Sequence, residues 1–228
     1  MLLKNIQQVL FLSIGLLGLL TACKKPDPVV LPLLLVAPAT LTPTAATARV
    51  GDTLWVEANY SDSLLDLNSN RRYRIRPQDM TLVAGVSAFF LHGNGQLTTG
   101  AIASLQVIPR VGRIKGISFE AEYDGRAYHI KFGLVPTQRG ILAISLLLVP
   151  QEGVKAYGTI LPFLQLPPNA QGREQKAAIE EMYFIVNRGQ ANNFDLYCQQ
   201  ATVNLQTANL PPKSLIYSQQ STFTVEVR

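Results

Sequence analysis

The sequence predicts a mainly β protein: an antiparallel β-sandwich, with a β-barrel as the alternative architecture. Three observations favour this fold class. Short segments of alternating apolar and polar residues recur along the chain, turn-forming residues separate them, and residues 117–132 have the full pattern of a β-hairpin. The part of the chain after residue 48 is long enough to form a single domain with one sizeable core, so residues 49–228 are expected to be one β-rich domain.

The expected strands begin with residues 53–60, in which Leu54, Val56 and Ala58 share one face. Residues 141–149 are almost continuously apolar. A run of this length is too short for a membrane span, which needs about 20 residues, so it predicts a buried central strand. Further strands are expected at residues 80–91, 101–109, 140–149, 157–166, 183–187, 194–205 and 222–228.

The clearest element is the hairpin over residues 117–132. Asp124-Gly125 is a dipeptide preferred in two-residue type I′ turns, because glycine accepts a positive φ freely and aspartate tolerates it. With such a turn Tyr123 is expected to face Arg126, and the apolar residues of the two strands then share one face.

One short helix is expected near residues 172–183. The segment "GREQKAAIEEMY" contains good helix formers and neither glycine nor proline after its first residue. Ala178, Ile179, Met182 and Tyr183 recur at the spacing of an apolar helical stripe.

The first residues have the pattern of an export signal. Lys4 supplies a positive charge, and residues 9–20 form an apolar run that is too short to span a bilayer. The sequence Leu20-Thr21-Ala22-Cys23 follows directly, and it resembles the lipobox of bacterial lipoproteins. The resemblance implies that residues 1–22 are a signal peptide and that the Cys23 sulfur is the site of lipidation.

A lipid on Cys23 would hold the protein on a membrane, because each buried methylene contributes about 0.8 kcal/mol and several chains on one residue add up. The next residue is Lys24, whereas in many inner-membrane lipoproteins an aspartate stands there; the resemblance therefore implies the outer membrane, with the periplasmic and surface faces both open. Residues 23–48 are expected to be the lipidated N-terminus and a Pro/Ala/Thr-rich tether. Within them, the apolar residues 29–36 fit either an edge strand on the domain or a segment near lipid headgroups.

Charge and cysteine content exclude two further classes. The chain has 20 basic and 15 acidic residues, and losing Lys4 with the signal peptide leaves 19 against 15. This mild excess does not indicate nucleic acid as a partner. Only Cys23 and Cys198 are present, so if Cys23 carries lipid no disulfide framework is expected, and Cys198 is predicted to be a buried apolar residue of a strand.

Two clusters are candidate binding sites. Acidic and amide residues in "DLNSN" (66–70) match the first ligand positions of a calcium loop, with Asp62 and Asp66 as the carboxylates, but the pattern breaks after residue 70 and an Asx-rich turn is the alternative. Arg72, Arg74 and Arg76 are expected on one strand face. They are candidate contacts for an anionic surface, such as lipid headgroups or an acidic partner, or else a solvated face that protects a sheet edge.

No catalytic motif is recognisable, and no catalytic residue or cofactor is predicted. His129 is expected to pair with Glu120 across the hairpin, which needs no catalytic role. The sequence therefore predicts a membrane-anchored binding or structural module of the cell envelope, with a glycan, an envelope polymer or a protein as the partner. A carrier of lipid or another apolar ligand and a β-sandwich hydrolase are the alternatives.

Overall fold

The computed structural model describes residues 26–91, 97–98, 101–115, 118–150, 158–200 and 219–228. The predicted signal peptide and Cys23 lie outside these residues.

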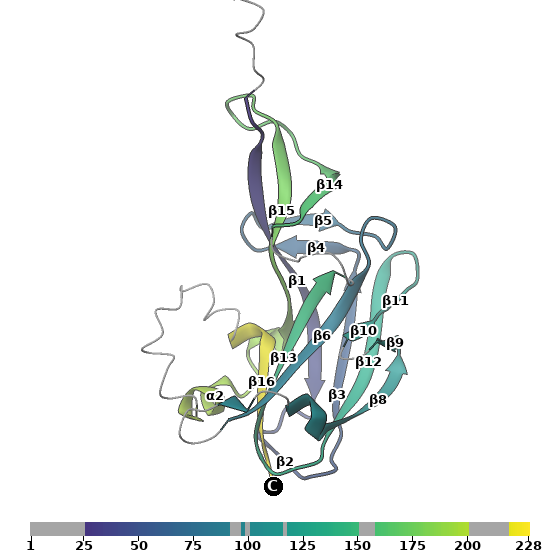
Figure 1. Cartoon of the computed structure of the whole chain (residues 1–228), viewed down its shortest axis with the longest axis vertical. Helices are drawn as coiled ribbons and strands as arrows, with labels where there is room; N and C mark the ends of the chain where they lie inside the picture. The colour runs from purple at the N-terminus through teal and green to yellow at the C-terminus, as the bar shows by residue number, and fades with distance from the viewer. Residues whose placement is uncertain (1–25, 92–96, 99–100, 116–117, 151–157, 201–218) are drawn as a thin grey trace, which may run out of the picture.

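The described chain is mainly β, as predicted, and its strands join into one continuous sheet (Figure 1). The strands are β1 (Val29–Thr42), β2 (Thr47–Ala48), β3 (Leu54–Ser61), β4 (Ser63–Asp66), β5 (Arg71–Arg74), β6 (Leu82–Leu91), β7 (Leu97–Thr98), β8 (Leu105–Val111), β9 (Arg113–Lys115), β10 (Ser118–Glu120), β11 (Glu122–Tyr123), β12 (Ala127–Pro136), β13 (Gly140–Pro150), β14 (Ile160–Gln165), β15 (Gln175–Val186) and β16 (Thr222–Val227). The helical segments are η1 (Ala101–Ser104), η2 (Asn187–Gly189) and α2 (Phe194–Gln200).

The sheet curls into a nearly closed barrel, the alternative that the sequence left open. Its strand order is β11-β12-β3-β1-β15-β13-β6-β10-β9, and β8 pairs with β12. Since β8 and β9 are separated only by Gly112, this residue is the corner at which the last strand returns to the first. Gly112 has φ +90°, and a Cβ there would clash with the Glu120 carbonyl oxygen, so the corner requires glycine.

The first residues of β1 extend beyond the barrel, and its last residues form one strand of the barrel wall. Residues 29–39 run parallel to β15, and residues 40–42 pair antiparallel with β3. Leu33 and Leu35 are fully buried. Residues 37–42 therefore belong to a strand and not to the expected tether, and of the two alternatives for residues 29–36 the strand is the one found, because an apolar strand gains more from pairing and burial than from remaining extended in water.

The expected helix at residues 172–183 is also wrong, since these residues enter β15. Its first part pairs with β1 and with β14, and Ala177, Ile179, Met182 and Phe184 are buried. Helix propensity is a weak preference of a few tenths of a kcal/mol per residue, and pairing with a strand more than 140 residues away outweighs it.

The strand expected over residues 194–205 begins instead as the helix α2; residues 201–205 lie outside the described part. The rings of Phe194 and Tyr197, three residues apart, stack with their centroids 5.3 Å apart, as neighbours on one helical face do. The side chain of Asn193, which precedes α2, donates to the carbonyl oxygen of Thr224 at 3.0 Å. The helix is thus fixed against β16 rather than added to the sheet.

Of the hairpin predicted over residues 117–132, only the tip around Asp124 forms, and with a longer loop: β11 pairs with β12, whereas residues 118–120 pair with β6 and β9. Tyr123 faces Tyr128 instead of Arg126. The reason is that Asp124 Oδ1 accepts hydrogen bonds from the backbone N–H groups of Arg126 (2.9 Å) and Ala127 (2.8 Å), which stabilises a wider turn. The register shifts by two residues, so each side chain keeps its predicted face.

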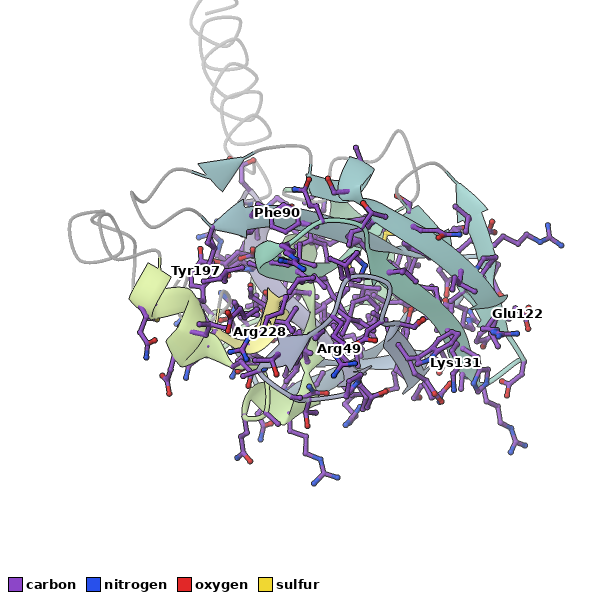
Figure 2. The ribbon with its side chains drawn as sticks, turned by 90° about the horizontal axis from the view of Figure 1, so that it is seen from below. Arg49, Phe90, Glu122, Lys131, Tyr197 and Arg228 are labelled. Atoms are coloured by element: carbon purple, nitrogen blue, oxygen red, sulfur yellow. The ribbon has the colours of Figure 1, made fainter. Side chains whose placement is uncertain are left out.

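The barrel interior is filled with apolar side chains. Phe119 and Phe132 stack at 3.7 Å between centroids, and Tyr60 packs against Tyr128 at 5.2 Å and Phe184 at 5.6 Å. Figure 2, a view from below, shows the labelled Phe90 within the body, whereas Arg49, Lys131 and Arg228 lie on its outside.

The first parts of β1 and β15, together with β14, extend beyond the barrel as an arm (residues 29–32, 160–165 and 175–178). It lies at the top of Figure 1, opposite the C-terminus, and the described chain begins at its tip. The backbone N–H of Val29 bonds to the Glu174 carbonyl oxygen at 2.8 Å, and Val30 and Ile160 leave 52% and 40% of their surface exposed. No helix among the described residues has the length and apolar character needed to cross a membrane.

Candidate functional site

The outer face of β1 carries a second apolar cluster, separate from the barrel core. Leu33, Leu35 and Ala37 point into the barrel, whereas Leu34 and Val36 point outward. The outward side chains pack with Tyr183 and, at the margin, with Leu65 and Ile185. This arrangement explains why residues 33–37 are all apolar, since both faces of the strand are covered there.

A groove of about 350 Å³ lies over this outer face. Cross-strand register brings its lining together: Val36 pairs with Leu65 of β4, and Leu65 in turn pairs with Arg72 of β5. On the other side Pro38 pairs with Ile185 of β15. The groove is lined by Val36, Ala37, Pro38, Leu65, Arg72, Ile185 and Arg188, and so combines an apolar floor with two arginines.

Arg188 reaches the groove from η2, just after β15 ends. Asn187 and Arg188 both adopt a positive φ, 48° and 58°. The Asn187 side chain fixes this turn because it pairs with both backbone groups of Leu41, at 2.8 and 3.1 Å, and donates to the Ala191 carbonyl oxygen at 2.7 Å. The sequence did not point to Arg188. The feature that could have led to it is the apolar run of β1, because a strand that is apolar on both faces needs a second surface beside it, and Arg188 lines that surface.

The three arginines predicted to contact an anionic surface have different surroundings. The Nε atom of Arg74 bonds to Asp62 at 2.8 Å, and that of Arg76 bonds to Asp79 at 3.0 Å. Arg72 is exposed and has no acidic partner among the described residues; its guanidinium donates to a backbone carbonyl oxygen at 2.8 Å. Of the three, Arg72 alone lines the groove.

Asp62, one of the two calcium candidates, is only 4% exposed and accepts hydrogen bonds from Arg74 and from the Tyr123 hydroxyl, both at 2.8 Å. Burial by itself raises the pKa of Asp62, but these two donors outweigh it and hold the pKa below the ordinary value. The carboxylate joins β5 and the hairpin to the end of β3.

Asp66, the other calcium candidate, uses both of its oxygens within the protein. Oδ1 accepts from the backbone N–H of Leu34 at 2.8 Å, and Oδ2 accepts from that of Ser69 at 3.0 Å. These contacts match the Asx-rich turn that was the alternative to a calcium loop. Over the described ranges, no three His, Cys, Asp or Glu side chains lie together so that they could hold a metal ion.

His129 lies on the exposed side of β12, but its partner differs from the expected Glu120. Its ring nitrogens lie 3.0 Å from Asn59 Oδ1 and 3.1 Å from Asp124 Oδ2. The backbone N–H groups of Ala127 and Arg126, followed by His129, lower the pKa of Asp124 to about 2. The cluster stabilises the hairpin turn and presents no nucleophile beside the imidazole.

Cys198 lies half-buried on α2 as a free thiol, instead of in the strand predicted for it. Burial, and secondarily the nearby Asp195 carboxylate, raise the pKa of the Cys198 thiol. The thiolate is therefore disfavoured, which argues against a nucleophilic role.

Comparison of the sequence with models of known protein families and with curated proteins gives no match. The function is therefore inferred from the groove, the arm and the N-terminal sequence.

Proposed function

We propose that the protein is a lipid-anchored lipoprotein of the bacterial cell envelope, on the outer membrane, and acts there as a binding module. The observation that carries this proposal is the lipobox ending at Cys23, immediately before the arm. Five residues lie between Cys23 and Val29, and the six steps of extended chain from one to the other span at most about 22 Å. A lipid on Cys23 would thus hold the tip of the arm close to the membrane surface.

The composition of the arm tip supports this orientation. Val30 exposes apolar surface there, and Lys176, which pairs with Val30, is exposed beside it. Lys24 and Lys25 follow the lipidated residue in sequence. Apolar and basic side chains suit a surface of anionic headgroups, and the exposed acids Asp27 and Glu174 near the tip offset only part of the basic charge.

The groove supports the binding role. It lies on strands whose opposite faces are packed into the barrel core, so its floor is rigid, and rigid elements hold a binding site in place. Its apolar floor also favours the alternative of a lipid or apolar ligand over a glycan, since a sugar needs several hydrogen-bonding side chains and the lining supplies only the two arginines.

The anchor is tested by metabolic labelling with radioactive palmitate. Wild-type protein should incorporate the label and stay with the membranes, whereas Cys23→Ser should lose both properties. Cys198→Ser is the matched control and should retain the label. Palmitate on the Cys23→Ser variant would refute the anchor.

Sorting is tested by separating the two membranes on a density gradient. Wild-type protein is expected with the outer membrane, and Lys24→Asp should move it to the inner membrane while leaving the palmitate label in place. A wild-type protein found in the inner membrane would refute the outer-membrane assignment but not the anchor.

A further inference from the structure

We propose that the groove over β1, β4 and β15 binds a single acyl chain that ends in an anionic group, specifically the carboxylate of a long-chain fatty acid. This inference deepens the binding role proposed above and rests on it, but it does not require a lipid on Cys23.

The apolar part of the lining fits a hydrocarbon chain. Pro38 is exposed and Leu65 and Ile185 are half-buried, so the groove presents apolar surface that no other described element covers. Ligand sites usually measure about 300–1,000 Å³. A volume of about 350 Å³ is at the lower end of this range and suits one chain better than a two-chain phospholipid.

The charged part of the lining fits an anion. Arg72 and Arg188 are its only charged members, and no acidic residue lines the groove. Both guanidinium groups are exposed, and neither has an acidic partner among the described residues. Arginine binds carboxylates through two parallel N–H···O bonds and is weakly hydrated, which suits it to a site beside apolar surface.

The backbone at Arg188 is an independent observation that points to the groove. A non-glycine residue with positive φ is uncommon, and two in succession, Asn187 and Arg188, are held here by the side-chain bonds of Asn187. Glycine would adopt this conformation without cost. Sparsely populated backbone conformations gather at binding sites, and this one places a guanidinium at the groove.

A peptide bound as an added strand fits the groove less well. The site lies over the face of the sheet, and the backbone of β1 beside it already pairs with β15 on one side and β4 on the other. At Leu35 and Val36, β1 therefore offers no free edge for backbone hydrogen bonds, which are the main source of affinity in that mode of binding.

The test uses the native lipoprotein in nanodiscs of phosphatidylcholine and a palmitic acid analogue that carries a photoreactive diazirine in its chain. After irradiation, mass spectrometry of the digested protein should find adducts on β1, β4 and the end of β15, and unlabelled oleate should compete for them. Arg72→Gln and Arg188→Gln should each lower the adduct yield several-fold, and the double variant about tenfold or more, because charge-assisted hydrogen bonds are lost.

Two controls isolate the anionic group. Arg126→Gln removes an exposed guanidinium that does not line the groove and should change nothing. The diazirine analogue of palmityl alcohol, which lacks the charge, should label wild-type protein as weakly as the acid labels the double variant. Equal labelling by the alcohol, or unchanged labelling of the double variant, would overturn the proposal.

A diazirine-bearing phosphatidylglycerol incorporated into the discs distinguishes the source of the chain. Stronger groove labelling by this lipid than by the free acid would overturn the fatty-acid assignment and indicate bilayer lipid. The mass of Cys23 is read from the same digest. An unmodified Cys23 together with specific groove labelling would refute the anchor while supporting the ligand.

Discussion

The two faces of β1 serve different purposes although they are built from the same kinds of residue. On the inner face, Leu33 and Leu35 meet a filled barrel and are fully buried. On the outer face, Leu34 and Val36 meet only the small cluster with Tyr183, and beyond it the groove opens. The inner face stabilises the fold, and the outer face is available for recognition because the inner face already fixes the strand.

The difference depends on the β4–β5 hairpin, residues 63–74, which covers part of the outer face. Two carboxylates hold this hairpin in place. Asp66 ties its first strand to the backbone of Leu34 in β1, and Asp62, at the end of β3, holds Arg74 of its second strand. The residues predicted from the sequence as calcium ligands are therefore arranged as supports of the groove wall.

The largest expected effect is the difference in unfolding free energy between substitutions on the inner and outer faces of β1. Leu35→Ala should lower the free energy of unfolding by about 2–5 kcal/mol, since it leaves a cavity in the barrel core. Val36→Ala removes two methyl groups from a partly covered face and should cost about 1–2 kcal/mol. Urea unfolding followed by circular dichroism measures both, and equal costs would contradict the distinction between the faces.

The second expected effect concerns the support of the groove wall. Asp66→Ala leaves the backbone N–H groups of Leu34 and Ser69 without their acceptors and should cost about 1–3 kcal/mol in the free energy of unfolding. Asp27→Ala, an exposed acid near the arm tip, is the control and should have almost no effect.

Calcium provides a contrasting test at the same residue. Because both Asp66 oxygens already accept hydrogen bonds within the protein, adding Ca²⁺ should leave the thermal unfolding midpoint of the wild type unchanged. A calcium-dependent rise that disappears in Asp66→Ala would restore the metal-site interpretation.

Sequence alone predicted the strands whose partners and faces follow from local alternation, such as β3 and β16. It failed where a distant partner decides the outcome. Residues 175–182 have helix-forming composition, and pairing with β1 and β14 makes them a strand. The groove was missed for the same reason, since Arg72 and Arg188 are brought together by register across β5, β4, β1 and β15, which no local pattern encodes.

A smaller effect is expected from acid. The pKa of Asp62 is below its ordinary value in the folded protein, so its carboxylate contributes stability that is fully present above about pH 4 and is lost as the pH falls through the folded-state pKa. Asp62→Asn should therefore flatten the acid side of a plot of unfolding free energy against pH. At neutral pH the variant should be less stable by about 1 kcal/mol, since a hydrogen bond to a charged group is weakened. An unchanged dependence of the unfolding free energy on pH would mean that the Asp62–Arg74 ion pair does not contribute to stability.

The smallest expected effect on stability is at Arg188, and this variant separates the stability of the fold from ligand binding in the groove. Arg188→Gly relieves a left-handed backbone conformation worth about 1–2 kcal/mol in a non-glycine residue, while the added freedom of the unfolded chain costs about 0.5–1 kcal/mol. The two terms nearly cancel, so the urea midpoint should stay level or rise slightly, although labelling of the groove by the diazirine acid should fall. Gly112→Ala is the contrasting variant at the barrel corner. It introduces a side chain that clashes with the Glu120 carbonyl oxygen, and it should clearly lower the free energy of unfolding. If Arg188→Gly instead lowered stability by more than about 1 kcal/mol, the guanidinium would be part of the fold, and the strained turn would need a structural explanation in place of a functional one.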